Sequence, residues 1–165
     1  MLYHIRGKFD AAHALMLPYE SKCRYLHGHT YRVSITLEVN DQDVFDGKLN
    51  MGIDFARIKG VLDAVLAVRD HALFLSNAGK AEFFGEGEPQ PGWRLTHGEP
   101  TAEYLAQDIY KALACEMGQL SKEGPEIILV AVTLGETDDQ GVTYYPNVAF
   151  GIASLEQVVA GAQSK

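Results

Sequence analysis

Two histidines separated by one glycine, in a segment typical of a β-strand, are the feature that most restricts how this chain can fold. The sequence His-Gly-His occupies residues 27–29, near the start of residues 25–39, which are rich in β-branched and aromatic side chains. Side chains two positions apart on a strand share a face, so His27 and His29 project together. The segment therefore predicts a strand that carries two imidazoles on one side.

A third histidine extends this pattern. His13 lies in residues 2–14, which also predict a strand, and an antiparallel pairing of the two strands would bring it beside His27 and His29. Three imidazoles are the ligand set of a catalytic zinc, which keeps its fourth position open for water or substrate. A His-x-His pair alone is less specific, because a half-buried strand can carry two histidines for hydrogen bonding. We therefore predict a Zn²⁺ site formed by His13, His27 and His29.

Two cysteines have different surroundings in the sequence. Cys23 lies four residues before His27 and could be a fourth ligand, a small buried apolar side chain, or a reactive thiol whose pKa a metal and a histidine lower. Spacing alone does not separate these roles. Cys115 falls in an apolar helical stripe, where we expect a buried and inert thiol, and nothing indicates a secreted disulfide framework.

Composition places the chain among ordinary soluble proteins. With 165 residues, 47% hydrophobic and 22% charged, it is long enough to bury a core, and we expect a single domain over residues 1–165. Its apolar runs are too short to span a membrane and its N-terminus lacks a signal-peptide core, so a cytoplasmic location is expected. A formal charge of −8 argues against non-specific binding to nucleic acid or membranes.

The order of predicted elements defines the fold class. Strand, strand, helix, helix, strand, strand predicts an α+β layout, an antiparallel sheet covered by two helices. One such unit leaves sheet edges exposed, so we expect oligomerisation to close them. The predicted elements are strands at 2–10 and 29–40, a polar turn at 41–48, a helix after the N-cap Asp54, a helix from the N-cap Thr101 to about Gly118, and strands at 127–134 and 142–150.

Five short blocks follow one another along the chain: Phe9–His13 (FDAAH), Cys23–Tyr31 (CRYLHGHTY), Met51–Lys59 (MGIDFARIK), Asp70-His71, and Pro100–Glu103 (PTAE) with Glu136-Thr137. In this order they resemble the 6-pyruvoyl-tetrahydropterin synthase and 6-carboxy-tetrahydropterin synthase family, over about residues 3–150. The resemblance implies the tunnelling fold, or T-fold, in which units assemble into an oligomeric barrel, usually a homohexamer with active sites between subunits. It also implies a small-molecule pterin substrate, 7,8-dihydroneopterin triphosphate, and the zinc ligands His13, His27 and His29.

The resemblance further implies a catalytic triad. Cys23 matches the catalytic thiol of the family, and Asp70 with His71 matches the remainder of a Cys/Asp/His triad. In such a site His71 exchanges protons with Cys23 while Asp70 fixes its tautomer. Taken without the resemblance, Asp70-His71 follows a predicted helix, where the helix dipole alone stabilises a histidine.

The pterin pocket is implied in the same way. Glu136 matches the pterin anchor, whose carboxylate can accept both the amide N–H and the exocyclic amine of a pterin. Without the resemblance it reads as a solvated turn carboxylate beside Asp138 and Asp139. Thr101 and Glu103 match positions that line the pocket, although an acid such as Glu103 also complements the dipole of a helix in its first turn.

The spacing of Cys23 bears on the product. In synthases of the biopterin route the thiol usually lies six positions before the His-Gly-His element, whereas here it lies four before His27, as in the 6-carboxy-tetrahydropterin synthases. The resemblance therefore implies a lyase of the deazapurine route toward queuosine, which also releases acetaldehyde. Ala102 departs from the Ser or Thr that members often carry. The alternatives are a 6-pyruvoyl-tetrahydropterin synthase, or a pterin-binding paralogue with altered or no turnover.

A long excursion at about residues 77–98 is a second departure from the compact members of the family. It is rich in Gly, Pro and Glu, and we expect no stable helix in it. Its ends are joined to His71 and Thr101, so we expect it to lie near the mouth of the pocket. Its large aromatic side chains should pack against other parts of the chain. They are Phe83, Phe84 and Trp93.

Overall fold

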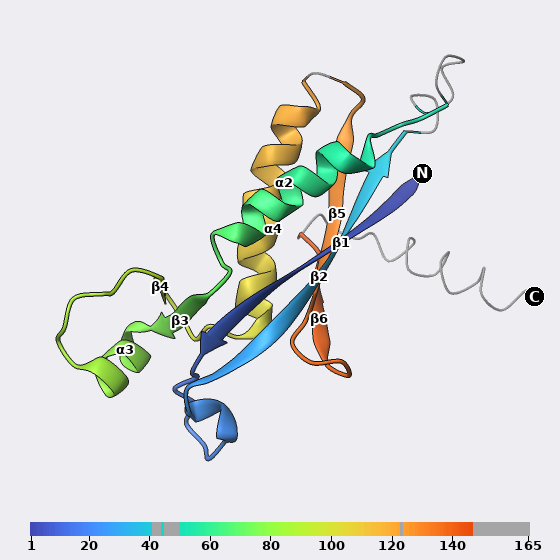
Figure 1. The fold of residues 1–165 in the computed structure, drawn as a ribbon. Coiled ribbons are helices and arrows are strands. Elements are labelled where there is room, and N and C mark those ends of the chain that lie inside the picture. The colour runs from blue at the N-terminus through green and yellow to red at the C-terminus, as the bar shows by residue number, and fades with distance from the viewer. Residues whose placement is uncertain (41–43, 45–49, 123, 147–165) are drawn as a thin grey trace, which may run out of the picture.

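The computed structural model describes residues 1–40, 44, 50–122 and 124–146 of the chain. They form a six-stranded sheet with two long helices, α2 and α4, on one side of it (Figure 1). The strand order is β4-β3-β1-β2-β5-β6. The elements are β1 (Leu2–His13), the short 3-10 helix η1 (Lys22–Arg24), β2 (His27–Val39), α2 (Phe55–Ala67), β3 (Ala72–Ser76), α3 (Asn77–Phe84), β4 (Trp93–Thr96), α4 (Ala102–Leu120), β5 (Ile127–Gly135) and β6 (Gly141–Tyr144).

The long β1–β2 pair is the centre of the sheet. It is antiparallel and runs without interruption from Leu2 opposite Glu38 to His13 opposite His27. Alternate side chains of both strands are buried under the helices, and the rings of Phe9 and Tyr31 stack at 5.0 Å between centroids. Because this apolar alternation fixes the register, the histidines at the far end of the pair must lie side by side.

Two capped helices cover the buried face of the sheet. The Asp54 side chain accepts the N–H of Ala56 before α2, and the Thr101 side chain accepts that of Tyr104 at the start of α4, so both predicted N-caps are confirmed. The core lies between the helices and the sheet. Its helical side includes Ile58, Leu62 and Leu66 of α2 and Leu105, Ile109, Leu113 and Met117 of α4.

The prediction for residues 72–96 was incomplete. This stretch adds two strands and a helix, and the sheet is mixed, because β3 pairs parallel with β1 and β4 pairs parallel with β3. The expectation of no helix in residues 77–98 was wrong for α3, whose N-cap Ser76 accepts the N–H of Gly79. Within this stretch the helix ends at Gly85, whose φ of +63° is a backbone conformation that favours glycine.

The structure also bears on the predictions for Gly118 and Cys115. Gly118 lies inside α4 and does not end it. Cys115 is exposed, contrary to prediction, because it stands two positions after the buried Leu113 and therefore points to another side of α4. The predicted turn at 41–48 lies almost wholly outside the described residues, as does the end of the last predicted strand. None of the helices that the structure describes is long and apolar enough to cross a membrane.

Candidate metal centre and substrate cavity

The three predicted imidazoles gather where β1 ends and β2 begins. His13 lies opposite His27 in the strand pair, and His29 lies opposite Ala11. One ring nitrogen of each histidine lies within 4.8 Å of the other two, and His13 is almost fully buried. Within the described ranges, this is the group of side chains that could hold a metal ion. The strand register therefore produces the cluster that the spacing of the sequence predicted.

Hydrogen bonds to backbone carbonyls orient two of these rings. His13 donates from Nδ1 to the carbonyl oxygen of Pro100 at 2.8 Å, and His27 donates from Nδ1 to that of Tyr25 at 2.7 Å. In the neutral rings both Nε2 atoms are then acceptors, yet they lie 3.1 Å apart. Two lone pairs at this distance repel unless a cation lies between them. This arrangement, with Nδ1 held by a carbonyl and Nε2 free to coordinate, is that of metal-binding histidines.

The third ring supplies a further observation. The Nε2 atom of His29 is buried and has no hydrogen-bond partner in the described structure. A buried polar atom without a partner is costly, and coordination of a metal would satisfy it. The three nitrogen donors therefore fit a zinc ion with an open fourth position.

Burial also keeps these rings in the form that binds metals. Burial lowers the pKa of His13 from its usual value, and the neighbouring His27 lowers it further against the opposing hydrogen bond to Pro100. Burial likewise lowers the pKa of His29, where the nearby Glu136 carboxylate acts in the opposite direction. Neutral imidazole is the ligand species, so these shifts favour metal binding near neutral pH.

Glu136 brings a carboxylate to the edge of the histidine cluster. It follows β5, and its Oε1 lies 3.4 Å from Nε2 of His13 and 3.7 Å from Nε2 of His29. Its side chain is 26% exposed, whereas that of Asp138 in the same turn is 80% exposed. Glu136 is therefore not an ordinary solvated turn residue.

Tyr31 is a site residue that the sequence analysis missed. It is fully buried, and its hydroxyl lies 3.4 Å from both Oε1 of Glu136 and Nδ1 of His13. Burial and the adjacent carboxylate raise the pKa of Tyr31, so the group stays a neutral hydroxyl that donates to Glu136. The signal was present, since Tyr31 continues the two-residue repeat of His27 and His29 along the same face of β2.

A cavity of about 320 Å³ lies beside the histidine cluster and is lined in part by four of the predicted site residues. Its volume is at the lower end of the range found for small-molecule pockets. Glu136 belongs both to this cavity and to the surroundings of the histidines, so the two adjoin. The predicted residues in its lining are Cys23, Thr101, Glu103 and Glu136.

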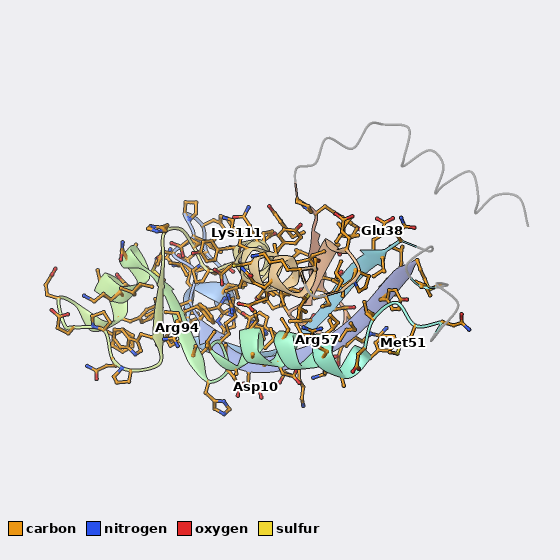
Figure 2. The ribbon with its side chains drawn as sticks, turned by 90° about the horizontal axis from the view of Figure 1, so that it is seen from above. Asp10, Glu38, Met51, Arg57, Arg94 and Lys111 are labelled. Atoms are coloured by element: carbon orange, nitrogen blue, oxygen red, sulfur yellow. The ribbon has the colours of Figure 1, made fainter. Side chains whose placement is uncertain are left out.

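Asp70 and His71 are not part of that cavity. His71 bonds through Nδ1 to Asp70 at 2.8 Å, and Asp70 accepts the backbone N–H of Asp10 at 2.8 Å; these two hydrogen bonds lower the pKa of Asp70. The His71 side chain is 82% exposed and its backbone has φ +58°. Figure 2 shows Asp10 on the opposite side of the molecule from Lys111 of α4. Of the predicted triad, Cys23 therefore lines the cavity beside the histidine cluster, whereas Asp70 and His71 of the same chain do not.

Two further depressions complete the surroundings. His71 and His29 border one of about 430 Å³. Another, of about 270 Å³, lies between the loop before β2 and α3, where Met16 and Arg24 face Phe83. The excursion therefore borders the loop that carries Cys23. A larger depression, of about 990 Å³, is lined by Arg6, Lys8 and Arg32 among others and by none of the predicted site residues, so it is not the candidate site.

The strand topology, the histidine cluster and the adjoining cavity together define a T-fold protein with a candidate metal-dependent site for a small molecule. The family model described as 6-pyruvoyl tetrahydropterin synthase matches residues 3–147. The chain belongs to this family. Its T-fold architecture and the resemblance of its sequence blocks are thereby confirmed.

Individual relatives and structures are consistent with this assignment. The chain is 34% identical over 104 residues to a 6-carboxy-5,6,7,8-tetrahydropterin synthase of Rickettsia bellii, which covers 61% of this chain and 71% of the relative. It is 30% identical over 133 residues to the enzyme of that name from Haemophilus influenzae, covering 78% and 87%. The structure of 6-pyruvoyl tetrahydropterin synthase from Plasmodium falciparum superposes with a TM-score of 0.65 at 21% identity, covering 88% and 98%, and shows a shared fold.

Proposed function

We propose that this chain is a zinc-dependent lyase that converts 7,8-dihydroneopterin triphosphate and water to 6-carboxy-5,6,7,8-tetrahydropterin, acetaldehyde and triphosphate. One observation carries the proposal: a three-histidine cluster adjoins a cavity that contains both a thiol and a partly buried carboxylate. On this proposal the enzyme acts in the cytoplasm, on the deazapurine route toward queuosine.

The metal would be held by the three imidazoles. His13, His27 and His29 would bind Zn²⁺ through their Nε2 atoms, and the carbonyls that accept from two of the Nδ1 atoms support this orientation. When bound, zinc supplies Lewis-acid chemistry, which acidifies coordinated hydroxyl groups and the adjacent C–H bond. The residues around it must then orient the substrate and move its protons.

Glu136 is proposed to orient the pterin ring. Its carboxylate can accept two N–H groups from one edge of the ring, and the hydroxyl of Tyr31 holds Oε1 on the side of the histidines. Thr101 and Glu103 line the same cavity at the start of α4 and would complete the pterin pocket. The side chain of the substrate would thereby be directed toward the metal.

Cys23 is proposed to act as general base, with its thiolate taking a proton from the substrate side chain. His71, oriented by Asp70, would exchange that proton with solvent. Because Asp70 and His71 lie outside the Cys23 cavity in one chain and His71 is highly exposed, we propose that they serve the site of an adjacent copy in a homohexamer.

A subunit-mixing experiment tests this arrangement. Mixing inactive Cys23→Ala and His71→Ala variants should restore part of the activity, since some mixed interfaces would contain both intact groups. A mixture that stays inactive, after subunit exchange is shown by mass spectrometry, would refute this arrangement.

The alternative function is that of a 6-pyruvoyl-tetrahydropterin synthase, which eliminates triphosphate without cleaving the side chain. The four-residue spacing between Cys23 and His27 and the names of the relatives favour the carboxy product.

The decisive experiment is to incubate the zinc-loaded protein with 7,8-dihydroneopterin triphosphate and identify the products. Acetaldehyde with the 6-carboxy pterin supports the proposal. A pyruvoyl product without acetaldehyde establishes the alternative, and pterin binding without turnover indicates a paralogue that has lost activity.

A further inference from the structure

Three consecutive residues before α4 each contact a different part of the site. The carbonyl of Pro100 accepts from Nδ1 of His13 at 2.8 Å, and Thr101 lines the cavity while it caps α4. The carboxylate of Glu99 accepts the backbone N–H of Met16 at 2.6 Å. Two of these contacts belong to the metal centre and the pocket. The third reaches the loop between β1 and β2, which carries Cys23.

This loop, residues 14–26, is folded onto itself around the cysteine. Leu15 donates its N–H to the carbonyl of Cys23 at 2.9 Å, and the N–H of Cys23 is accepted by the hydroxyl of Ser21 at 3.1 Å. The guanidinium of Arg24 donates to the carbonyl of Leu17 at 3.3 Å. The backbone of Cys23 is therefore attached to that of Leu15. Met16, the next residue, is the one that Glu99 holds.

We propose that Glu99 is a positioning residue, which fixes the Cys23 loop against the N-terminal end of α4 so that the thiol faces the cavity lined by Thr101 and Glu136. A hydrogen bond to an ionised carboxylate is stronger than one between neutral groups, which suits an anchor at a single backbone amide. Glu99 does not line the cavity, so it acts through Met16 and not on the substrate. The catalytic part of this inference rests on the proposed function, whereas the anchoring of the loop does not.

The test compares Glu99→Ala with Glu99→Gln, whose amide oxygen can still accept from Met16. Both are made in a Cys115→Ser background, because Cys115 is also exposed. Glu116→Ala, an exposed acid on α4, serves as the matched control. In zinc-loaded protein, Glu99→Ala should increase hydrogen exchange in residues 14–26 and the alkylation rate of Cys23 by about tenfold, with zinc content unchanged. The Gln variant should stay close to the parent protein.

Turnover supplies the second readout. We expect Glu99→Ala to lower kcat by about tenfold with little change in KM, because the thiol is displaced while the pterin pocket remains, and Glu99→Gln to restore kcat. Unchanged exchange and alkylation in Glu99→Ala would overturn the anchor, and faster exchange with unaltered kcat would overturn its positioning role. Should the Ala variant fail to fold, Glu99→Asp, one methylene shorter, is compared instead with the same expected changes. Exchange and alkylation need no turnover, so a protein that releases no acetaldehyde would refute the proposed function alone.

Discussion

Replacing Glu136 by Gln is the sharpest test of the proposal that this cavity recognises a pterin. The substitution keeps the size of the side chain and removes its charge and one acceptor oxygen. Tyr31 donates to Oε1, which leaves Oε2 and the remaining lone pairs of the carboxylate for a ligand. In the variant, the single amide oxygen can face either Tyr31 or the ligand. In each case the NH₂ group, a donor, takes the place of a carboxylate oxygen, which is an acceptor.

The expected magnitude follows from this count of donors and acceptors. A pterin edge offers two N–H donors, so the new amide would replace at least one charge-assisted hydrogen bond with two donors that face each other. Losing that bond and leaving a mismatched group should weaken binding by about 2 to 4 kcal/mol. This corresponds to a roughly 30- to 1000-fold higher Kd. Zinc content should not change if Glu136 is a pterin anchor.

The measurement is a fluorescence titration of zinc-loaded protein with a stable oxidised pterin, together with metal analysis. Asp139→Asn is the matched control, because it removes the same charge from an exposed position in the same turn. An affinity within twofold of wild type, or an equal loss in Asp139→Asn, would show that the anchor lies elsewhere. Loss of zinc in Glu136→Gln would instead make the carboxylate a metal ligand.

Three further outcomes are expected. We expect the wild type to bind about one zinc per chain and a double variant, His27→Ala with His29→Ala, to lose it; unaltered metal content would eliminate the site. Cys23→Ala should abolish turnover while zinc and pterin binding persist, whereas loss of zinc would identify the thiol as a fourth ligand. Because the pKa values of His13 and His29 are lowered in the folded chain, the unfolded chain binds more protons than the folded chain once the pH falls below about 6.5. The metal-free protein should therefore keep its full free energy of unfolding above that pH and lose part of it below. Urea unfolding midpoints of wild type and of His29→Ala at pH 7.5 and pH 5.5 check this, and midpoints that do not change between the two pH values would contradict it.

The sequence was sufficient where periodicity and local chemistry determine the structure. The alternation of residues 29–39 fixes which side of β2 is buried, and this alternation places His27 and His29 together. The caps Asp54 and Thr101 act within their own turns, so each could be recognised from a few neighbouring residues.

Tertiary contacts determine what the sequence did not reveal. The short apolar run of β3 becomes a strand through parallel pairing with β1 and β4, which no local pattern encodes. The carbonyl of Pro100 orients His13, but a backbone carbonyl carries no sequence signature of its own. The φ of +58° and the exposure of His71 also depend on contacts distant in sequence, notably the bond from its amide to the carbonyl of Asp10.

The histidine cluster and the Cys23 thiol are held in place by different parts of the fold, so a structural change in one part should affect one of them more than the other. The histidines are held by the β1–β2 register and by the carbonyl of Pro100, which lies just before α4. The Cys23 loop is held at Met16 by Glu99, and it faces Phe83 of α3 across a small cavity. A change in the packing of α3 is therefore expected to affect the Cys23 loop, which shares this cavity, more than the three histidines, which do not line it. On the proposed function, a change in α3 would therefore alter proton transfer at Cys23 and leave the three histidines in place.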